Sequence, residues 1–189
     1  MATGTRTASP ADDIAEVLID APAIAAKVAE LGARIGADYA DKDPVFVSIL
    51  KGALPFLADL IRQVQIPLSL DFLEVSSYGA STETSGVVRI LKDLARPVEG
   101  RHVLVVEDIL DTGTTLGYVL GHLRDQRPAS LRLCTLLDKP ARRTVPIAVD
   151  YRGFEIPDRF VVGYGLDYAE RYRNLPFIGV LKPEVYGRV

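Results

Sequence analysis

The chain has 189 residues, of which 48% are hydrophobic and 25% charged, as is typical of an ordinary globular domain with a full core. Its net charge of −3 argues against nonspecific binding to nucleic acid or to an anionic membrane. One cysteine excludes an internal disulfide, and together with only two histidines it argues against a zinc site. We therefore expect neither nucleic acid nor membrane among the partners.

The N-terminal segment is polar and lacks the apolar core of a signal peptide. No apolar run approaches the ~20 residues that a membrane helix needs. We therefore expect a cytoplasmic protein. Residues 1–13 are predicted to be a disordered tail, and residues 14–189 to form one domain.

The first half of the chain alternates between strand-like and helix-like patterns. One helix is predicted to begin near Pro22, and a second is predicted after Lys51-Gly52, each with apolar residues every three or four positions. Pro67–Tyr78 alternates between apolar and polar residues, and a polar, glycine-bounded loop follows it. Strands are predicted over residues 16–19, 45–50, 67–78 and 87–91.

The most informative stretch begins with the valine-rich run at residues 103–106, which has the length and composition of a buried parallel strand. Glu107 and Asp108 close that run, and the small residues 111–115 lead into a helical pattern. A strand, a small-residue turn and a helix start together predict an anion cradle. The alternative is an ordinary capped helix, with Asp111 or Thr112 as the cap. Adjacent carboxylates at a strand end are costly unless they are used, which favours the cradle.

The second half continues with a strand at residues 130–137 that ends in Asp138-Lys139-Pro140. Short strands are predicted over residues 147–151, 160–164 and 177–181. The alternation predicts an α/β fold, a mainly parallel sheet flanked by helices. We expect its core to span about residues 40–140. A small hood over the carboxyl edge of the sheet is expected from the N-terminal segment and about residues 145–189.

Residues 107–115 resemble the phosphoribosyl pyrophosphate signature of the type I phosphoribosyltransferases. Further matches are Leu50-Lys51-Gly52-Ala53, Ser76-Ser77-Tyr78-Gly79, Asp138-Lys139-Pro140 and the long purine-site motif at residues 154–168. Together they cover about residues 14–186 and narrow the resemblance to the hypoxanthine-guanine branch. The resemblance implies the type I phosphoribosyltransferase fold and a purine salvage reaction. In that reaction phosphoribosyl pyrophosphate and hypoxanthine or guanine give IMP or GMP and pyrophosphate, with Mg²⁺ as cofactor.

The resemblance also implies a role for each matching residue. Asp111 is the expected base for the purine N7 proton, and Glu107 and Asp108 are expected to hold the ribose hydroxyls and Mg²⁺. Asp167 is expected near a second Mg²⁺ beside the purine. The other expected groups are Asp111, Thr112, Gly113, Thr114 and Thr115 for the 5-phosphate and ribose; Lys51, Gly52 and Arg173 for pyrophosphate; Ser77 and Tyr78 in a mobile loop; and Lys139, Phe160 and Val161 for the purine. A cis peptide is implied between Lys51 and Gly52, and a homodimer or homotetramer is expected.

Two other functions remain open at this stage. One is a relative that prefers xanthine, since the sequence does not rank the three oxopurines. The other is a regulator of the same fold that senses phosphoribosyl pyrophosphate and binds RNA. The acidic chain, together with Asp111, the Ser77-Tyr78 pair and Lys139, favours the enzyme.

Overall fold

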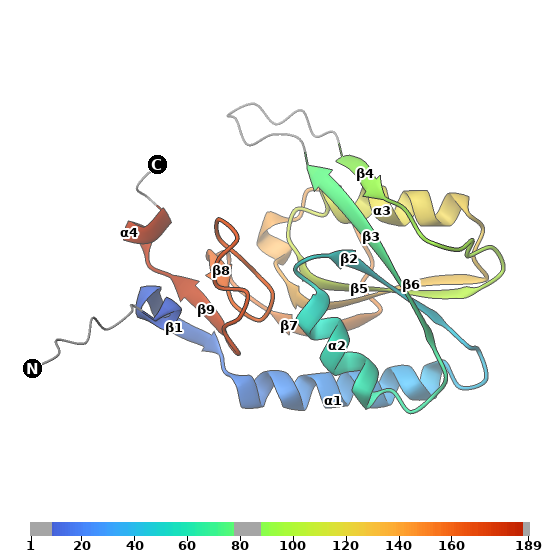
Figure 1. Cartoon of the computed structure of the whole chain (residues 1–189), viewed down its shortest axis with the longest axis horizontal. Helices are drawn as coiled ribbons and strands as arrows, with labels where there is room; N and C mark the ends of the chain where they lie inside the picture. The colour runs from blue at the N-terminus through green and yellow to red at the C-terminus, as the bar shows by residue number, and fades with distance from the viewer. Residues whose placement is uncertain (1–8, 78–87, 187–189) are drawn as a thin grey trace, which may run out of the picture.

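The computed structural model describes residues 9–77 and 88–186. Figure 1 shows a large twisted sheet with helices packed against it and a smaller sheet to one side. The strands of the large sheet lie in the order β4 (Val88–Lys92), β3 (Ser69–Ser77), β2 (Val45–Leu50), β5 (His102–Leu110), β6 (Ser130–Asp138) and β7 (Tyr151–Glu155). Neighbouring strands are parallel except β4, which is antiparallel to β3 at one edge. The predicted mixed α/β fold with a mainly parallel sheet is therefore confirmed.

Helices cover both faces of this sheet because its strands are apolar on both faces. Phe46 packs with α1 (Ala21–Asp38) and α2 (Leu54–Gln63), whereas its neighbour Val47 packs on the other side with α3 (Thr114–Asp125). The inward stripe of α1 is buried as its spacing predicted, at Ile24, Val28, Leu31 and Ile35. Among the described residues, no helix has the length and apolar character to span a membrane.

The smaller sheet, which we call the hood, consists of β1 (Ile14–Ile19), β9 (Ile178–Leu181) and β8 (Val161–Val162), all antiparallel. In it β1, near the start of the chain, pairs with β9, near its end (Figure 1). The chain is ordered before the predicted boundary at residue 14, because Pro10–Asp13 forms a 3₁₀ helix capped by Ser9. A short helix, α4 (Pro183–Tyr186), follows β9.

Two strand predictions near the C-terminus need correction. The strand predicted at residues 147–151 lies instead at β7, where Tyr151 pairs with Cys134 of the large sheet. Ile147 and Val149 alternate in the sequence because both pack against the α3 side of the core. The core thus extends beyond residues 40–140 to include α1 and β7. The strand predicted at residues 160–164 stops at Val162, since the next two residues have positive φ angles.

Candidate active site

The large sheet has a topological switch point between β2 and β5: the chain adds β3 and β4 on one side of this pair, and β6 and β7 on the other. Pairing of β5 with β2 stops at Val106, whereas pairing with β6 continues to Leu110. The strand therefore runs through Glu107 and Asp108, which were predicted to close it, and continues for two more residues to Leu110. Parallel sheets bind ligands outside the carboxyl ends of strands at such a switch point.

Asp108 is buried, and Glu107 is partly buried with one carboxylate oxygen fully enclosed. Within the described chain, Oε2 of Glu107 is buried without a hydrogen-bond partner. Burial and the adjacent Asp108 carboxylate raise the pKa of Glu107 well above its usual value. Burial also raises the pKa of Asp108 to about 6, although the Ile109 N–H donates to its Oδ1 at 2.7 Å. Carboxylates shifted in this way at a sheet switch point mark a functional site.

The shift makes a prediction about stability. The pKa of Asp108 is 3.8 when unfolded and about 6 when folded, so the folded protein holds this proton more tightly than the unfolded chain does. The gain in folding free energy from the protonated side chain is therefore complete below about pH 4 and is lost as the pH rises through 6. A rise of about two units corresponds to about 3 kcal/mol. We expect Asp108→Asn, free of ligands, to exceed the wild type in unfolding free energy by up to that amount near pH 7.5. The difference should shrink toward pH 4. Urea unfolding across this pH range measures it, and equal stability near pH 7.5 would contradict it.

The turn after β5 leaves the start of α3 free for a ligand. The N-cap of α3 is Gly113, with φ 88°, and the hydroxyl of Thr112 accepts from the N–H of Thr114, the first residue of the helix, at 3.4 Å. The N–H groups that follow, from Thr115 on, meet no side-chain cap and are available to an anion. A hollow of about 210 Å³ lies here, lined by Glu107, Ile109, Leu110, Asp111, Thr112, Gly113, Thr115 and Leu116. The structure thus brings the predicted phosphate turn and Glu107 together.

The expected base and the expected purine lysine share one cluster of charges. Oδ1 of Asp111 is buried without a hydrogen bond, and Nε of Arg142 lies 3.5 Å from it. Nη1 of Arg142 is 3.8 Å from Oδ1 of Asp158, which is 4.0 Å from Nζ of Lys139. Lys139 is only 5% exposed. Arg142 and Asp158 had no role in the sequence interpretation, because only folding brings Arg142 beside Asp111 and Asp158 beside Arg142 and Lys139.

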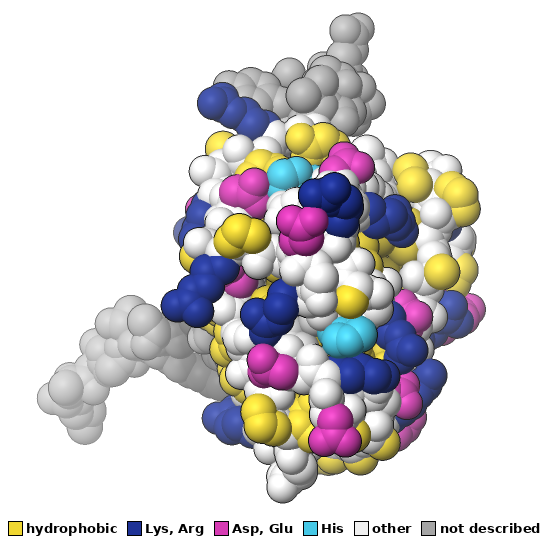
Figure 2. Space-filling view, turned by 90° about the vertical axis from the view of Figure 1, so that its right-hand side faces the viewer, with side chains coloured by type: hydrophobic (Ala, Val, Ile, Leu, Met, Phe, Trp, Pro, Cys, Tyr) yellow, Lys and Arg dark blue, Asp and Glu magenta, His cyan; other side chains and the backbone are white. Residues whose placement is uncertain are grey.

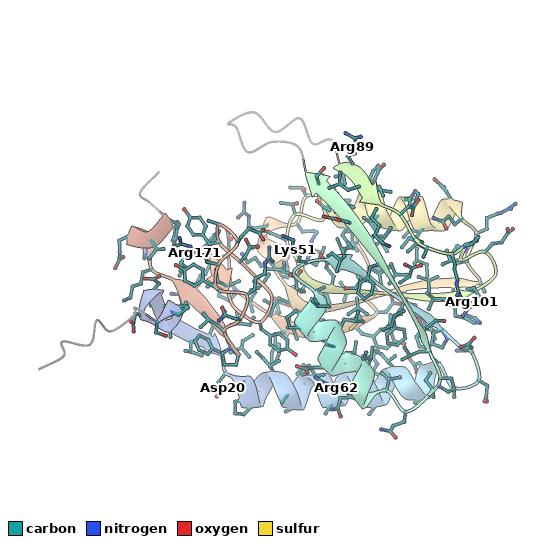
Figure 3. The ribbon with its side chains drawn as sticks, in the orientation of Figure 1. Asp20, Lys51, Arg62, Arg89, Arg101 and Arg171 are labelled. Atoms are coloured by element: carbon teal, nitrogen blue, oxygen red, sulfur yellow. The ribbon has the colours of Figure 1, made fainter. Side chains whose placement is uncertain are left out.

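Gly52 connects the second strand–turn–helix junction to the carboxylates. A Cβ at this position would lie 1.9 Å from Oδ2 of Asp108, so a side chain here would displace that carboxylate. The cis peptide bond is between Leu50 and Lys51, one bond before the position expected from the resemblance. Lys51 lies at the junction of the large sheet and the hood loops (Figure 3).

Glu170 joins the two cations expected to bind pyrophosphate, and the sequence interpretation missed it. Its Oε2 is 2.9 Å from Nζ of Lys51, and its Oε1 is 3.1 Å from Nη2 of Arg173. Arg173 also contacts Oδ1 of Asp167 at 2.7 Å and donates to the Gly165 carbonyl at 2.8 Å. Its Nε is buried and makes no hydrogen bond to the described residues, so it is directed at neither acid.

Phe160 and Val161, two of the expected purine residues, lie at the hood, whereas Lys139 follows β6 of the large sheet. Phe160 is 41% exposed, and its ring stacks on Tyr186 with centroids 5.0 Å apart. Val161 is buried in β8, where it pairs with Val180. Ser77 ends β3, whereas Tyr78 and the predicted mobile loop lie outside the described residues.

Segment 143–145 supports the phosphate turn and was also missed from the sequence. The Thr112 carbonyl accepts from the backbone N–H groups of Thr144 at 2.9 Å and Val145 at 3.1 Å. A Cβ on Gly113 would lie 2.9 Å from the Val145 carbonyl oxygen, so the turn is seated closely on this segment. Contacts between residues this far apart leave no local sequence signal.

Comparison with known proteins gives the same class that the fold and site define. Residues 15–169 match the family described as Phosphoribosyl transferase domain. The hypoxanthine-guanine phosphoribosyltransferase of Bacillus subtilis (strain 168) is 56% identical over 174 residues, which are 92% of this chain and 97% of that protein. The chain therefore belongs to the phosphoribosyltransferase family, in its hypoxanthine-guanine branch, as the resemblance indicated.

Solved structures agree with this assignment. A hypoxanthine phosphoribosyltransferase from Staphylococcus aureus has a TM-score of 0.89 and 51% identity, covering 93% of this chain and 95% of that one. A Trypanosoma cruzi hypoxanthine phosphoribosyl transferase has a TM-score of 0.88 and 41% identity, covering 95% and 97%. The T. cruzi protein was studied for the role of its C-terminal region in oligomeric state and activity.

Proposed function

We propose that this protein transfers the phosphoribosyl group of phosphoribosyl pyrophosphate to hypoxanthine or guanine, giving IMP or GMP and pyrophosphate. The observation that carries the proposal is the hollow at the turn of residues 111–115, which Glu107 also lines, next to the buried Asp108. That pairing suits a phosphorylated sugar, since N–H groups bind the phosphate and carboxylates accept from the ribose hydroxyls. The family membership supports the same reaction.

The reaction develops positive charge on the ribose, so catalysis depends on holding charges in place and keeping water out. Glu107 and Asp108 would lie beside the ribose and stabilise that charge. Lys51 and Arg173 would bind the departing pyrophosphate, for which Arg173 has a suitable planar fork. Both cations now contact Glu170, so pyrophosphate would compete with that carboxylate for them.

Mg²⁺ fits the donors present at this edge of the sheet. Mg²⁺ prefers one or two carboxylates and completes its shell with substrate oxygens and water. The unpartnered Oε2 of Glu107 and the raised pKa of Asp108 indicate carboxylates that a cation would stabilise. Asp167 accepts from Glu170 N–H and contacts Arg173, and each of its oxygens keeps a further lone pair for a second ion. When bound, Mg²⁺ would neutralise charge on the diphosphate.

Purine recognition is assigned to Asp111 and Lys139, with Phe160 and Val161. The Asp111 carboxylate, whose side chain is 38% exposed, would accept the N7 proton of the base. Lys139 would donate to the 6-oxo group, which adenine lacks. The exposed ring of Phe160 would stack on the purine, and the Val161 backbone would contact its exocyclic edge.

We also propose a cytoplasmic location and assembly as a homodimer or homotetramer. The interest in oligomeric state of the T. cruzi relative supports assembly. Light scattering after size-exclusion chromatography tests it, with a mass of two or four chains expected and the mass of one chain as the contradicting result.

Turnover with four bases tests the reaction. We expect purified protein, Mg²⁺ and phosphoribosyl pyrophosphate to convert hypoxanthine and guanine, with adenine slower by at least about 10²-fold, because a site built to donate a hydrogen bond rejects a base that cannot accept it. The xanthine rate ranks the alternative substrate in the same assay. Absence of IMP and GMP would contradict the proposed function, and rapid AMP formation would contradict the role of Lys139.

The RNA-binding regulator is the less favoured alternative. The face shown in Figure 2 carries Lys and Arg side chains intermingled with Asp and Glu, without a continuous basic surface. Together with the net charge of −3, this disfavours a phosphate-backbone partner. RNA affinity measured against salt concentration would separate the two functions.

A further inference from the structure

One partly buried arginine links the two halves of the proposed nucleotide site. Nε of Arg143 donates to the Asp111 carbonyl at 2.9 Å, and its Nη2 donates to the Leu110 carbonyl at 3.1 Å. The same Nη2 forms an ion pair with Oδ1 of Asp138. The side chain of Arg143 is 16% exposed and that of Asp138 is 1% exposed. A single guanidinium thus joins the end of β5, the start of the phosphate turn and the end of β6.

The topology explains why an arginine is needed here. Pairing between β5 and β6 ends at Leu110 and Asp138, where the Lys139 N–H still donates to the Leu110 carbonyl, so the Asp111 carbonyl is the first beyond the paired strands and accepts from Arg143. Buried carbonyls and carboxylates must be satisfied by other donors. Arginine presents several N–H groups in a fixed fork and can satisfy three acceptors at once, whereas a lysine ammonium is a point charge on a flexible stem.

The acceptors of Arg143 belong to both ligand subsites. Asp111 begins the phosphate turn and is the expected base. Asp138 directly precedes Lys139, whose backbone N–H donates to the Leu110 carbonyl at 3.0 Å. Arg143 itself is assigned no substrate contact, so any effect on the reaction would pass through these neighbours.

We propose that Arg143 is a positioning residue that fixes the phosphate turn relative to the purine lysine, so that one nucleotide engages both subsites. The inference rests on the proposed function. A nucleotide gains affinity when both of its ends meet prepositioned partners, because the second contact is then effectively intramolecular. A ligand that occupies only the phosphate turn gains nothing from this alignment. Loss of the link should therefore weaken the binding of GMP far more than the binding of ribose 5-phosphate.

Arg143→Lys tests this against a matched control, Arg152→Lys. Arg152 forms the other ion pair of Asp138, with its Nε 2.8 Å from Oδ2, and no contact joins it to the carbonyls of Leu110 or Asp111. Both variants keep the charge, so they separate the carbonyl link from simple neutralisation of Asp138. Calorimetric titration of each protein with GMP and with ribose 5-phosphate measures the affinities. We expect Arg143→Lys to weaken the affinity for GMP by about 10- to 100-fold and the affinity for ribose 5-phosphate by less than about threefold.

The control should change both affinities by less than about threefold. Unchanged GMP affinity in Arg143→Lys would overturn the inference, as would equal weakening of both ligands, which a purely structural loss would cause. Thermal unfolding identifies misfolding; in that event Arg143→Gln, which retains an N–H donor, is judged by the same ratio of affinities. Wild-type protein that fails to bind GMP would contradict the proposed function itself, a result distinct from the other two.

Discussion

Replacing Asp111 by asparagine is expected to lower kcat for GMP formation by about 10²–10⁴-fold, the range for loss of a general base. Oδ1 of Asp111 is buried, has no hydrogen bond within the described structure and points at no backbone N–H of α3. Asparagine keeps the shape of the side chain but cannot take the N7 proton. The loss should therefore fall on turnover, with a smaller change in KM for phosphoribosyl pyrophosphate.

The same substitution should leave the fold nearly unchanged. Loss of a helix cap costs about 1 kcal/mol, but α3 is capped by the Gly113 backbone and loses no side-chain cap here. Asp125→Asn, exposed at the far end of the same helix, is the matched control and should retain wild-type turnover. A folded Asp111→Asn protein with kcat within about threefold of the wild type would show that Asp111 is not the base.

Elements with a continuous local pattern could be predicted from the sequence. Val45–Leu50 was predicted with its observed bounds, because an apolar run between Pro44 and Lys51-Gly52 suits a strand buried on both faces. The apolar stripe of α1 and the turn before α3 could be predicted in the same way. Glu107, Asp108 and the turn at residues 111–115 were placed together because one strand and one helix carry them all.

Features that depend on partners distant in the chain could not be predicted. The alternation at Ile147 and Val149 is typical of a strand, but these two side chains pack against the α3 side of the core without strand pairing of their backbone. The contact of Lys51 with Glu170 spans 119 residues, and that of Arg143 with Leu110 spans 33. No periodicity or short motif encodes such pairs, so Glu170, Arg142 and Arg143 emerged only from the fold.

Substituting Lys139 by glutamine is expected to change which purine is used. A hydrogen bond from a charged donor contributes about 1.5–3 kcal/mol, so kcat/KM for guanine should fall by about 10- to 100-fold. A glutamine amide can also accept from the 6-amino group of adenine. The ratio of guanine to adenine activity should therefore fall further than guanine activity alone.

The burial of Lys139 gives this substitution its specificity. The side chain is almost fully enclosed at the end of β6, and its charge is opposed by Asp158 at 4.0 Å. A surface lysine would be free to move, and its loss would leave base choice intact. Lys42→Gln, exposed between α1 and β2, provides the control and should keep the wild-type ratio. Competition between guanine and adenine in one reaction measures the ratio directly. If Lys139→Gln keeps the wild-type ratio while guanine turnover falls, the lysine supports the site without reading the 6-position.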